Sequence, residues 1–245
     1  MIQLLVTGKS GRMGQAVLQA ANQEPAVMVT ATHDAGENLV AAIAEANTVI
    51  DFTMHKFTRE LLDAALAKGT HLVIGTTGHT DEEREAIREA AKTLPIVYAP
   101  NFSVGVNTLF WLTQKAAQIL TQDRFDIEVT EMHHRHKIDA PSGTARRLLE
   151  ILNEETGTKY EKDIAHGRFG NVGPRAPREI GMHTLRGGDV VGDHTVMFAA
   201  DGERVELTHK ASSRLTFAAG AVRAAVWLYD KQAGLYDMQD VLGLK

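Results

Sequence analysis

A glycine-rich turn between an apolar strand and a helix, at the start of the chain, constrains the fold more than any other feature. Gly8, Gly11 and Gly14 form the pattern G-x-x-G-x-x-G, with Ser10 where the commoner dinucleotide-binding pattern has its middle glycine. Gly8 permits a tight turn, Gly11 lets the backbone approach a pyrophosphate, and Gly14 lets the helix pack closely on the strand. The layout is typical of the first unit of a dinucleotide-binding domain, although glycine-rich turns also occur without a ligand.

Short apolar strands and helices continue to alternate over the first hundred residues. Further strands are predicted at residues 27–32, 48–52, 71–74 and 96–99. The segment from Thr80 to Glu83 is a capping box, which predicts the start of a helix. This alternation predicts an α/β domain with a Rossmann-type, doubly wound parallel sheet.

Candidate cofactor residues follow the predicted strands, because open parallel sheets bind ligands at the carboxyl ends of their strands. Asp34 follows the second strand, where an acidic residue commonly accepts hydrogen bonds from the adenosine ribose. A surface-turn aspartate is an equally good interpretation. An acid here favours NAD over NADP because it repels a 2′-phosphate, but Lys9 and Arg12 lie in the facing loop and counter that repulsion. The residues alone therefore leave the cofactor preference open.

A run of five residues that are or can become cationic, at positions 133–137, stands out in a chain of net charge −5. Mutual repulsion makes such a run unfavourable unless an anion binds there. Downstream, Ser142 is the predicted N-cap of a helix, so the amides of Gly143 and Thr144 are expected to point outward and hold a carboxylate or phosphate. The pattern indicates a site for an anionic substrate that must also receive a proton.

Two other interpretations of this run remain. A charge run is often only a solvated face. Adjacent histidines also ligate zinc, and an extended strand would place His134 and His136 on one face. The chain has no cysteine, which excludes disulfides, zinc-thiolate sites and thiol catalysis.

The second half predicts an α+β domain on a mixed or antiparallel sheet. Strands are expected at 179–186, 190–199 and 203–211, with hairpin turns at Gly187-Gly188 and Asp201-Gly202 and a long loop at 158–178. We expect a dinucleotide-binding domain at 1–102, completed by 218–245, and a substrate-binding and oligomerisation domain at 103–217. One face of the second sheet is expected to mediate symmetric oligomerisation.

Composition limits the partners and the cellular location that are expected for this chain. The chain is slightly acidic, which argues against a nucleic-acid partner. No apolar run approaches the length of a membrane span, and the first residues are typical of a strand rather than a signal peptide. A cytoplasmic protein with neither a nucleic-acid nor a membrane partner is expected.

Taken together, these motifs resemble the 4-hydroxy-tetrahydrodipicolinate reductase (dihydrodipicolinate reductase) family of bacterial diaminopimelate and lysine biosynthesis. The most specific part is residues 133–145, HHRHKIDAPSGTA. Further matching segments are residues 8–14, 51–53, 75–78, 99–105 and 209–214. The resemblance covers the whole chain.

The resemblance implies roles for individual residues. His133 and Lys137 are the implied proton donors, and which of them delivers the proton is left open. His134 and the amides of Gly143 and Thr144 are the implied substrate-carboxylate site. The implied cofactor contacts are Gly8, Lys9, Ser10, Gly11, Arg12, Met13, Asp34, Gly75, Thr76, Thr77, Ala99, Pro100, Asn101 and Phe102. No metal is implied.

The resemblance also implies a homotetramer that uses NADH, NADPH or both, and a small dicarboxylate substrate. Some members carry an arginine directly after the acid of the second strand, which binds the 2′-phosphate. Here Ala35 and Gly36 follow Asp34, which favours dual use or NADH. Two alternatives stay open: a non-catalytic regulator that binds NAD(H), and a zinc hydrolase that uses His133, His134 and His136.

Overall fold

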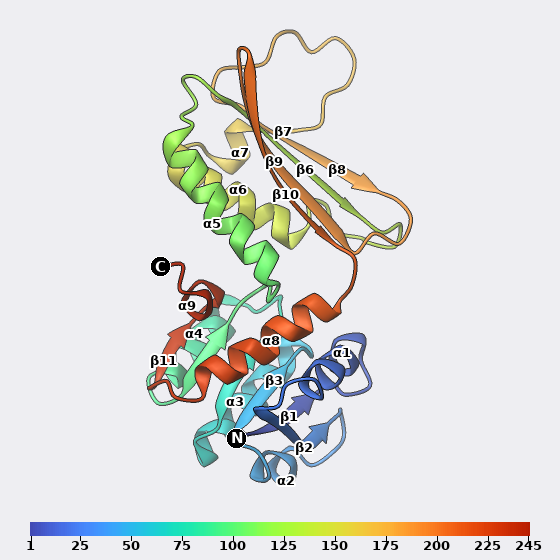
Figure 1. The fold of residues 1–245 in the computed structure, drawn as a ribbon, viewed down its shortest axis with the longest axis vertical. Coiled ribbons are helices and arrows are strands. Elements are labelled where there is room, and N and C mark those ends of the chain that lie inside the picture. The colour runs from blue at the N-terminus through green and yellow to red at the C-terminus, as the bar shows by residue number, and fades with distance from the viewer. The chain divides into compact units, whose positions relative to one another are not determined.

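The computed structural model describes residues 1–245 and divides them into two compact units. Unit 1 comprises Met1–Val104 and Arg214–Lys245, and unit 2 comprises Gly105–Ser213 (Figure 1). None of the helices combines the length and the apolar character that a membrane span requires.

Unit 1 is built on a six-stranded, fully parallel sheet of strand order β11-β5-β4-β3-β1-β2. The strand that follows Lys231, β11, joins this sheet beside β5. Its elements are β1 (Ile2–Thr7), α1 (Arg12–Ala21), β2 (Val27–His33), α2 (Leu39–Ala44), β3 (Thr48–Asp51), the 3₁₀ turn η1 (His55–Phe57), α3 (Thr58–Lys68), β4 (His71–Ile74), α4 (Asp81–Ala91), β5 (Pro95–Tyr98), α8 (Leu215–Leu228), β11 (Gly234–Tyr236) and α9 (Met238–Leu242).

Both faces of this sheet are buried, as parallel strands require. Leu4 and Val6 of β1 pack into one cluster with α1 and α8. Leu5, between them in sequence, points to the opposite cluster with α2, α3 and α4. The period-two alternation of a strand thus divides its apolar residues between two helical layers.

Unit 2 is built on a five-stranded mixed sheet of order β10-β9-β6-β8-β7. Helices α5 and α6 pack on one face, against Ile127, Val129 and Phe198 (Figure 1). The elements are α5 (Val104–Ile119), β6 (Asp126–His133), α6 (Gly143–Thr156), α7 (Tyr160–Asp163), β7 (Ile164–His166), β8 (Ile180–Arg186), β9 (Gly192–Ala200) and β10 (Glu203–Ala211).

The expected hairpin at Gly187-Gly188 is wrong. Strand β6 lies between β8 and β9, parallel to the former and antiparallel to the latter. Gly187 instead donates its amide to the His133 carbonyl at 2.9 Å, and the Gly188 carbonyl accepts the Arg135 amide at 3.2 Å. A glycine pair favours a turn but does not specify which strand the chain pairs with after it, and here β6 already occupies the adjacent position. The turn at Asp201-Gly202 does join paired strands, β9 and β10.

The loop expected at residues 158–178 is also partly wrong, because α7 and β7 occupy residues 160–166. These elements have four and three residues, too short for a periodic pattern to appear in the sequence. The remainder is irregular, but Arg175 holds it to β6 through Asp126 at 2.9 Å and Glu128 at 3.2 Å.

Gly14→Ala is predicted to destabilise unit 1. A Cβ at Gly14 meets the Gly8 carbonyl oxygen at 2.0 Å, so α1 must move off the turn. We expect a loss of about 1–3 kcal/mol in the free energy of unfolding, as for overpacked sites generally. Gly143→Ala is the matched control, since a Cβ there meets nothing within 4 Å. Calorimetric unfolding of both variants measures the difference, and equal melting temperatures contradict the packing argument.

Candidate active site

The glycine turn of unit 1 is shaped to receive an anion. Gly8 has a φ of +66° and donates its amide to the His33 carbonyl at 2.8 Å, and Gly11 donates to the Gly8 carbonyl at 2.9 Å. Gly11 is the N-cap of α1 and offers no capping side chain, so the first amides of the ten-residue helix point outward with their partial positive charge. A Cβ at Gly11 would lie 3.2 Å from the Gly8 oxygen and fill this cradle. The turn therefore fits a dinucleotide pyrophosphate.

Two acids, rather than one, follow β2. Asp34 accepts the Ser10 amide at 3.1 Å, which ties this turn to the glycine turn. Glu37 accepts the Asp34 amide at 2.8 Å and pairs with Lys9 Nζ at 2.5 Å. Lys9 and the Asp34 amide hold the pKa of Glu37 below its ordinary value. The sequence pattern did not predict a role for Glu37. Its ion pair takes up the lysine that was expected to counter the charge of Asp34.

A buried carboxylate connects three strand ends in unit 1. Asp51 is fully buried and accepts hydroxyl hydrogen bonds from Thr7 at 2.6 Å, Thr53 at 2.7 Å and Thr76 at 2.5 Å. These residues follow or end β1, β3 and β4, which are neighbours in the sheet. The Thr76 hydroxyl also accepts the Thr53 amide at 2.9 Å. Thr76, an expected cofactor contact, therefore has its hydroxyl committed to holding the loops.

Some of the other residues that were expected to contact the cofactor are buried in the core, and others are exposed. Phe102 is buried with its ring 5.6 Å from that of Phe52, and a Cβ at Gly220 would meet the Phe102 carbonyl oxygen at 1.8 Å. Its side chain thus supports the sheet rather than facing solvent. Ala99 and Gly75 are also buried, whereas Thr77 and Pro100 are exposed and Met13 and Asn101 are half-buried. Cofactor contact by these residues remains a prediction.

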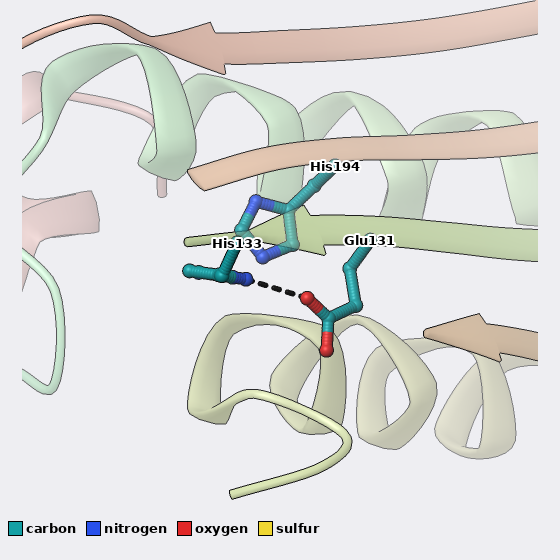
Figure 2. Close-up of side chains that lie close together, drawn as sticks. All are labelled: Glu131, His133 and His194. Atoms are coloured by element: carbon teal, nitrogen blue, oxygen red, sulfur yellow. Dashed lines mark hydrogen bonds and ion pairs between the residues drawn. The ribbon is translucent and has the colours of Figure 1, made fainter. Parts of the chain in front are cut away.

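Strand β6 positions the central group of unit 2. Glu131 and His133 lie on the same face because they are two residues apart on a strand. His133 Nδ1 lies 2.5 Å from Glu131 Oε2, and Figure 2 shows the imidazole edge directed at the carboxylate. Arg186, on the adjacent strand β8, binds both carboxylate oxygens of Glu131 at 3.0 Å. Glu131 and His133 are buried, and Arg186 is half-buried.

The same carboxylate reaches the loop that starts α6. The Ser142 amide donates to Glu131 Oε1 at 3.0 Å, and the Ser142 hydroxyl caps the helix by accepting the Ala145 amide at 3.2 Å. Ser142 is therefore the N-cap, as the sequence predicted. The Ser142 hydroxyl is also hydrogen-bonded to His194 Nε2 at 3.1 Å. Gly143 lies exposed in the first turn with open space where a Cβ would be.

The cationic run does not act as one block. His133 is buried, His134 and Lys137 are half-buried, and Arg135 and His136 are exposed. The Lys137 ammonium pairs with Asp139 at 2.8 Å. Burial by itself raises the pKa of Asp139, but the hydrogen bond and the charge of Lys137, together with smaller contributions from the Asp139 backbone amide and Arg186, lower that pKa. The strand ends at His133, so His134 and His136 belong to a loop rather than to one strand face.

The electrostatic environment leaves the buried groups around His133 in different charge states. Burial would raise the pKa of Glu131, but hydrogen bonds from His133, Arg186 and the Ser142 amide lower it to about 2. Burial, reinforced by the neighbouring His133, lowers the pKa of His194 to about 3. At neutral pH, Glu131 is therefore ionised and His194 is neutral.

Potential metal ligands also meet here. Glu131, His133 and His194 each place a donor atom within 4.8 Å of the others. However, both oxygens of Glu131 accept hydrogen bonds from the Arg186 guanidinium, whose charge repels a cation at the same place. The arrangement is that of an ion-paired hydrogen-bond network. His134 and His136, which the zinc hypothesis needs beside His133, are not part of this group.

Sequence reasoning missed Glu131, Arg186, His194, Asp51 and Glu37 as members of the sites. Glu131 had a local signal, its two-residue spacing from His133, and Asp51 lies in the segment 51–53 that resembles the family. Arg186 and His194 lie 55 and 63 positions from Glu131 in the sequence, and only the strand order β9-β6-β8 brings them to it.

A Rossmann-type unit with a helix N-terminus that has no capping side chain above a glycine turn, joined to a unit that presents an imidazole beside a second helix N-terminus, defines an oxidoreductase that uses a nicotinamide dinucleotide. Family models described as dihydrodipicolinate reductase, N-terminus, and dihydrodipicolinate reductase, C-terminus, match residues 2–102 and 105–242. The chain belongs to the dihydrodipicolinate reductase family.

Individual relatives agree with this assignment. The chain is 63% identical over 244 residues to the 4-hydroxy-tetrahydrodipicolinate reductase of Akkermansia muciniphila, covering 100% of this chain and 99% of that protein. It is 47% identical to the enzyme of that name from Chromobacterium violaceum, covering 99% and 98%. The fold is similar to that of the dipicolinate-bound dihydrodipicolinate reductase from Paenisporosarcina sp. TG-14, with a TM-score of 0.81, 22% identity and 98% of each chain covered.

Arg186→Leu is predicted to destabilise unit 2 strongly. It leaves the ionised carboxylate of Glu131 buried without its cation, and breaking a buried pair in this way costs about 3 kcal/mol or more. Arg135→Leu is the matched control, because Arg135 is exposed and such surface changes stay within about 0.5 kcal/mol. Urea unfolding at pH 7 measures both.

The same pair makes the stability depend on pH. The pKa of Glu131 is about 2 in the folded protein against an ordinary 4.5. Its contribution is therefore complete above pH 4.5 and is lost as the pH falls toward 2. The difference between wild type and Arg186→Leu should shrink over that range, and a difference independent of pH contradicts the assignment.

Proposed function

We propose that this protein reduces 4-hydroxy-tetrahydrodipicolinate to tetrahydrodipicolinate with a hydride from NADH or NADPH, in diaminopimelate and lysine biosynthesis. Membership of the family supports the reaction. The structural observation that carries the proposal is the buried His133, fixed by Glu131 beside the N-terminus of α6. His133 can supply a proton, and the amides of residues 143–144 can hold an anion.

The substrate is a planar heterocycle with two carboxylates. In the proposed complex the amides of Gly143 and Thr144 hold one carboxylate at the N-terminus of α6, a helix of 14 residues. His134 and Lys137 supply positive charge. Lys137 already has a partner in Asp139, so substrate binding requires the ammonium to exchange or share that partner. Its main role is then fixed charge.

His133 is the proposed proton donor. In the proposed reaction the 4-hydroxyl of the substrate leaves as water, which gives a conjugated ring. The dinucleotide, when bound, would supply a hydride to a carbon of that ring. Electron density then moves toward the far end of the conjugated system, where His133 protonates it. An imidazole titrates near neutral pH and is suited to this task, and general acid catalysis is worth roughly 10²–10⁴-fold in rate.

The dinucleotide is proposed to bind unit 1. Its pyrophosphate lies on residues 8–13, its adenosine ribose against Asp34, and its nicotinamide beside residues 75–77 and 99–102. The network around Asp51 supports this, since it fixes three of the loops at that edge of the sheet.

Homotetramer formation and a cytoplasmic location are part of the proposal. The face of the second sheet that α5 and α6 do not cover carries Met132, Met197 and the 45%-exposed Leu185. Apolar side chains on an uncovered sheet face suit a symmetric interface. No membrane or nucleic-acid partner is proposed.

Turnover with the product of the preceding synthase tests the function directly. Oxidation of the reduced nicotinamide is followed by absorbance, separately with NADH and NADPH. Binding of NAD(H) without turnover favours the non-catalytic regulator instead. Activity lost on chelation and restored by zinc favours the hydrolase.

Variants of the two adjacent histidines should separate binding from chemistry. His133→Ala removes the proton donor and is expected to lower kcat by about 100-fold or more with a smaller change in KM. His134→Ala removes a carboxylate ligand and should mainly raise KM. Steady-state kinetics of both variants measure the split, and small, equal effects contradict the assignment.

Glu37→Gln is predicted to shift cofactor use toward NADPH. The change removes a negative charge near the expected 2′ position and releases Lys9 from its 2.5 Å ion pair. Because the pair is exposed, we expect the NADPH-to-NADH ratio of kcat/KM to rise modestly, by about threefold to tenfold. Glu60→Gln, an exposed change on α3 in the same unit, is the control. An unchanged ratio in Glu37→Gln contradicts the role of Glu37.

A further inference from the structure

Glu131 is a buried carboxylate with every acceptor position in use. Oε2 receives His133 Nδ1 at 2.5 Å and Arg186 Nη1 at 3.0 Å. Oε1 receives Arg186 Nη2 at 3.0 Å and the Ser142 amide at 3.0 Å. Its side chain is completely buried.

This environment determines which nitrogen of His133 carries the proton. Arg186 and the Ser142 amide can only donate, so the carboxylate is held in its ionised form, which can only accept. The contact at 2.5 Å is therefore a hydrogen bond from Nδ1–H to the carboxylate. In the neutral imidazole, Nε2 then has no hydrogen and is the nitrogen that gains and loses the catalytic proton.

The surroundings of Nε2 fit that role. A Cβ at Gly192, on β9, would lie 2.9 Å from His133 Nε2. Glycine at this position keeps the nitrogen uncovered, where any other residue would press on it. The histidine is thus held at Nδ1 and left open at Nε2.

We propose that Glu131 is the positioning residue of the reductase reaction: it fixes His133 with its proton on Nδ1, selects Nε2 as the proton donor to the substrate, and ties this histidine to the carboxylate-binding loop through the Ser142 amide. The assignment rests on the proposed function for the identity of the reaction. The tautomer itself does not depend on it.

The charged and titratable groups around His133 come from three strands and one loop. Glu131 lies on the same strand, Arg186 on β8 and His194 on β9, with the His194 ring centroid 5.2 Å from that of His133. The loop adds Lys137, paired with Asp139. Among these, Glu131 is the anion in direct contact with the imidazole.

Glu131→Gln tests the proposal, with Glu128→Gln as the matched control. Glu128 is three residues earlier on β6, faces the other side of the sheet, and is likewise bound by arginines, Arg168 at 2.7 Å and Arg175 at 3.2 Å. Both variants remove one arginine-bound carboxylate. Only Glu131→Gln changes the partner of His133.

In Glu131→Gln we expect kcat to fall by about 100-fold or more, because tautomer control and general acid catalysis are lost together. The imidazolium loses its stabilising anion, so the basic limb of the kcat/KM profile should move to lower pH by about one unit or more. Glu128→Gln should keep the wild-type profile. A wild-type basic limb in Glu131→Gln overturns the proposal.

The tautomer is measured independently by nitrogen NMR of histidine-labelled wild-type protein, with His133 assigned by the loss of its signals in His133→Asn. A neutral imidazole protonated on Nδ1 supports the proposal, and one protonated on Nε2 overturns it even if Glu131→Gln does not fold. Absence of wild-type turnover with the dicarboxylate would sink the proposed function and leave this measurement valid.

Discussion

The ion pair between Glu131 and Arg186 is the interaction on which the arrangement of unit 2 depends. It joins β6 to β8, directs His133, and holds the loop before α6 through Ser142. A buried carboxylate is stable only when its charge is compensated and its acceptor positions are filled. This requirement explains why the strand order, the imidazole and the helix N-terminus are fixed together rather than separately.

Unit 1 also contains a buried carboxylate, and hydroxyl groups fill its acceptor positions. Asp51 gathers Thr7, Thr53 and Thr76, and thereby fixes the ends of three neighbouring parallel strands. In both units a buried acid at or near the end of a strand holds the loops beside it through hydrogen bonds. The rigidity comes from the core side of each loop, whereas the first turns of α1 and α6 lie on its outer side.

Much of the fold and part of the site were predictable from sequence. The parallel sheet followed from apolar runs alternating with helices, and the capping box at Thr80 and the N-cap at Ser142 were confirmed. Those signals are local, since each depends on residues within a few positions of one another. The hairpin expected at Gly187-Gly188 failed because strand pairing is not local: the insertion of β6 between β8 and β9 is decided by burial of Ile127, Val129 and Phe198 beneath α5 and α6.

The sequence by itself determined the types of chemistry available: a glycine turn for a pyrophosphate, and imidazole and amide groups for an anionic substrate that accepts a proton. Only the tertiary structure decided which of these groups is held in a fixed orientation and which residues hold it. His133 is distinguished from His134 and His136 by the buried carboxylate beside it, and that carboxylate is ionised because Arg186, 55 residues away, binds it. Charge compensation in a buried site depends on distance in space, which sequence spacing does not give.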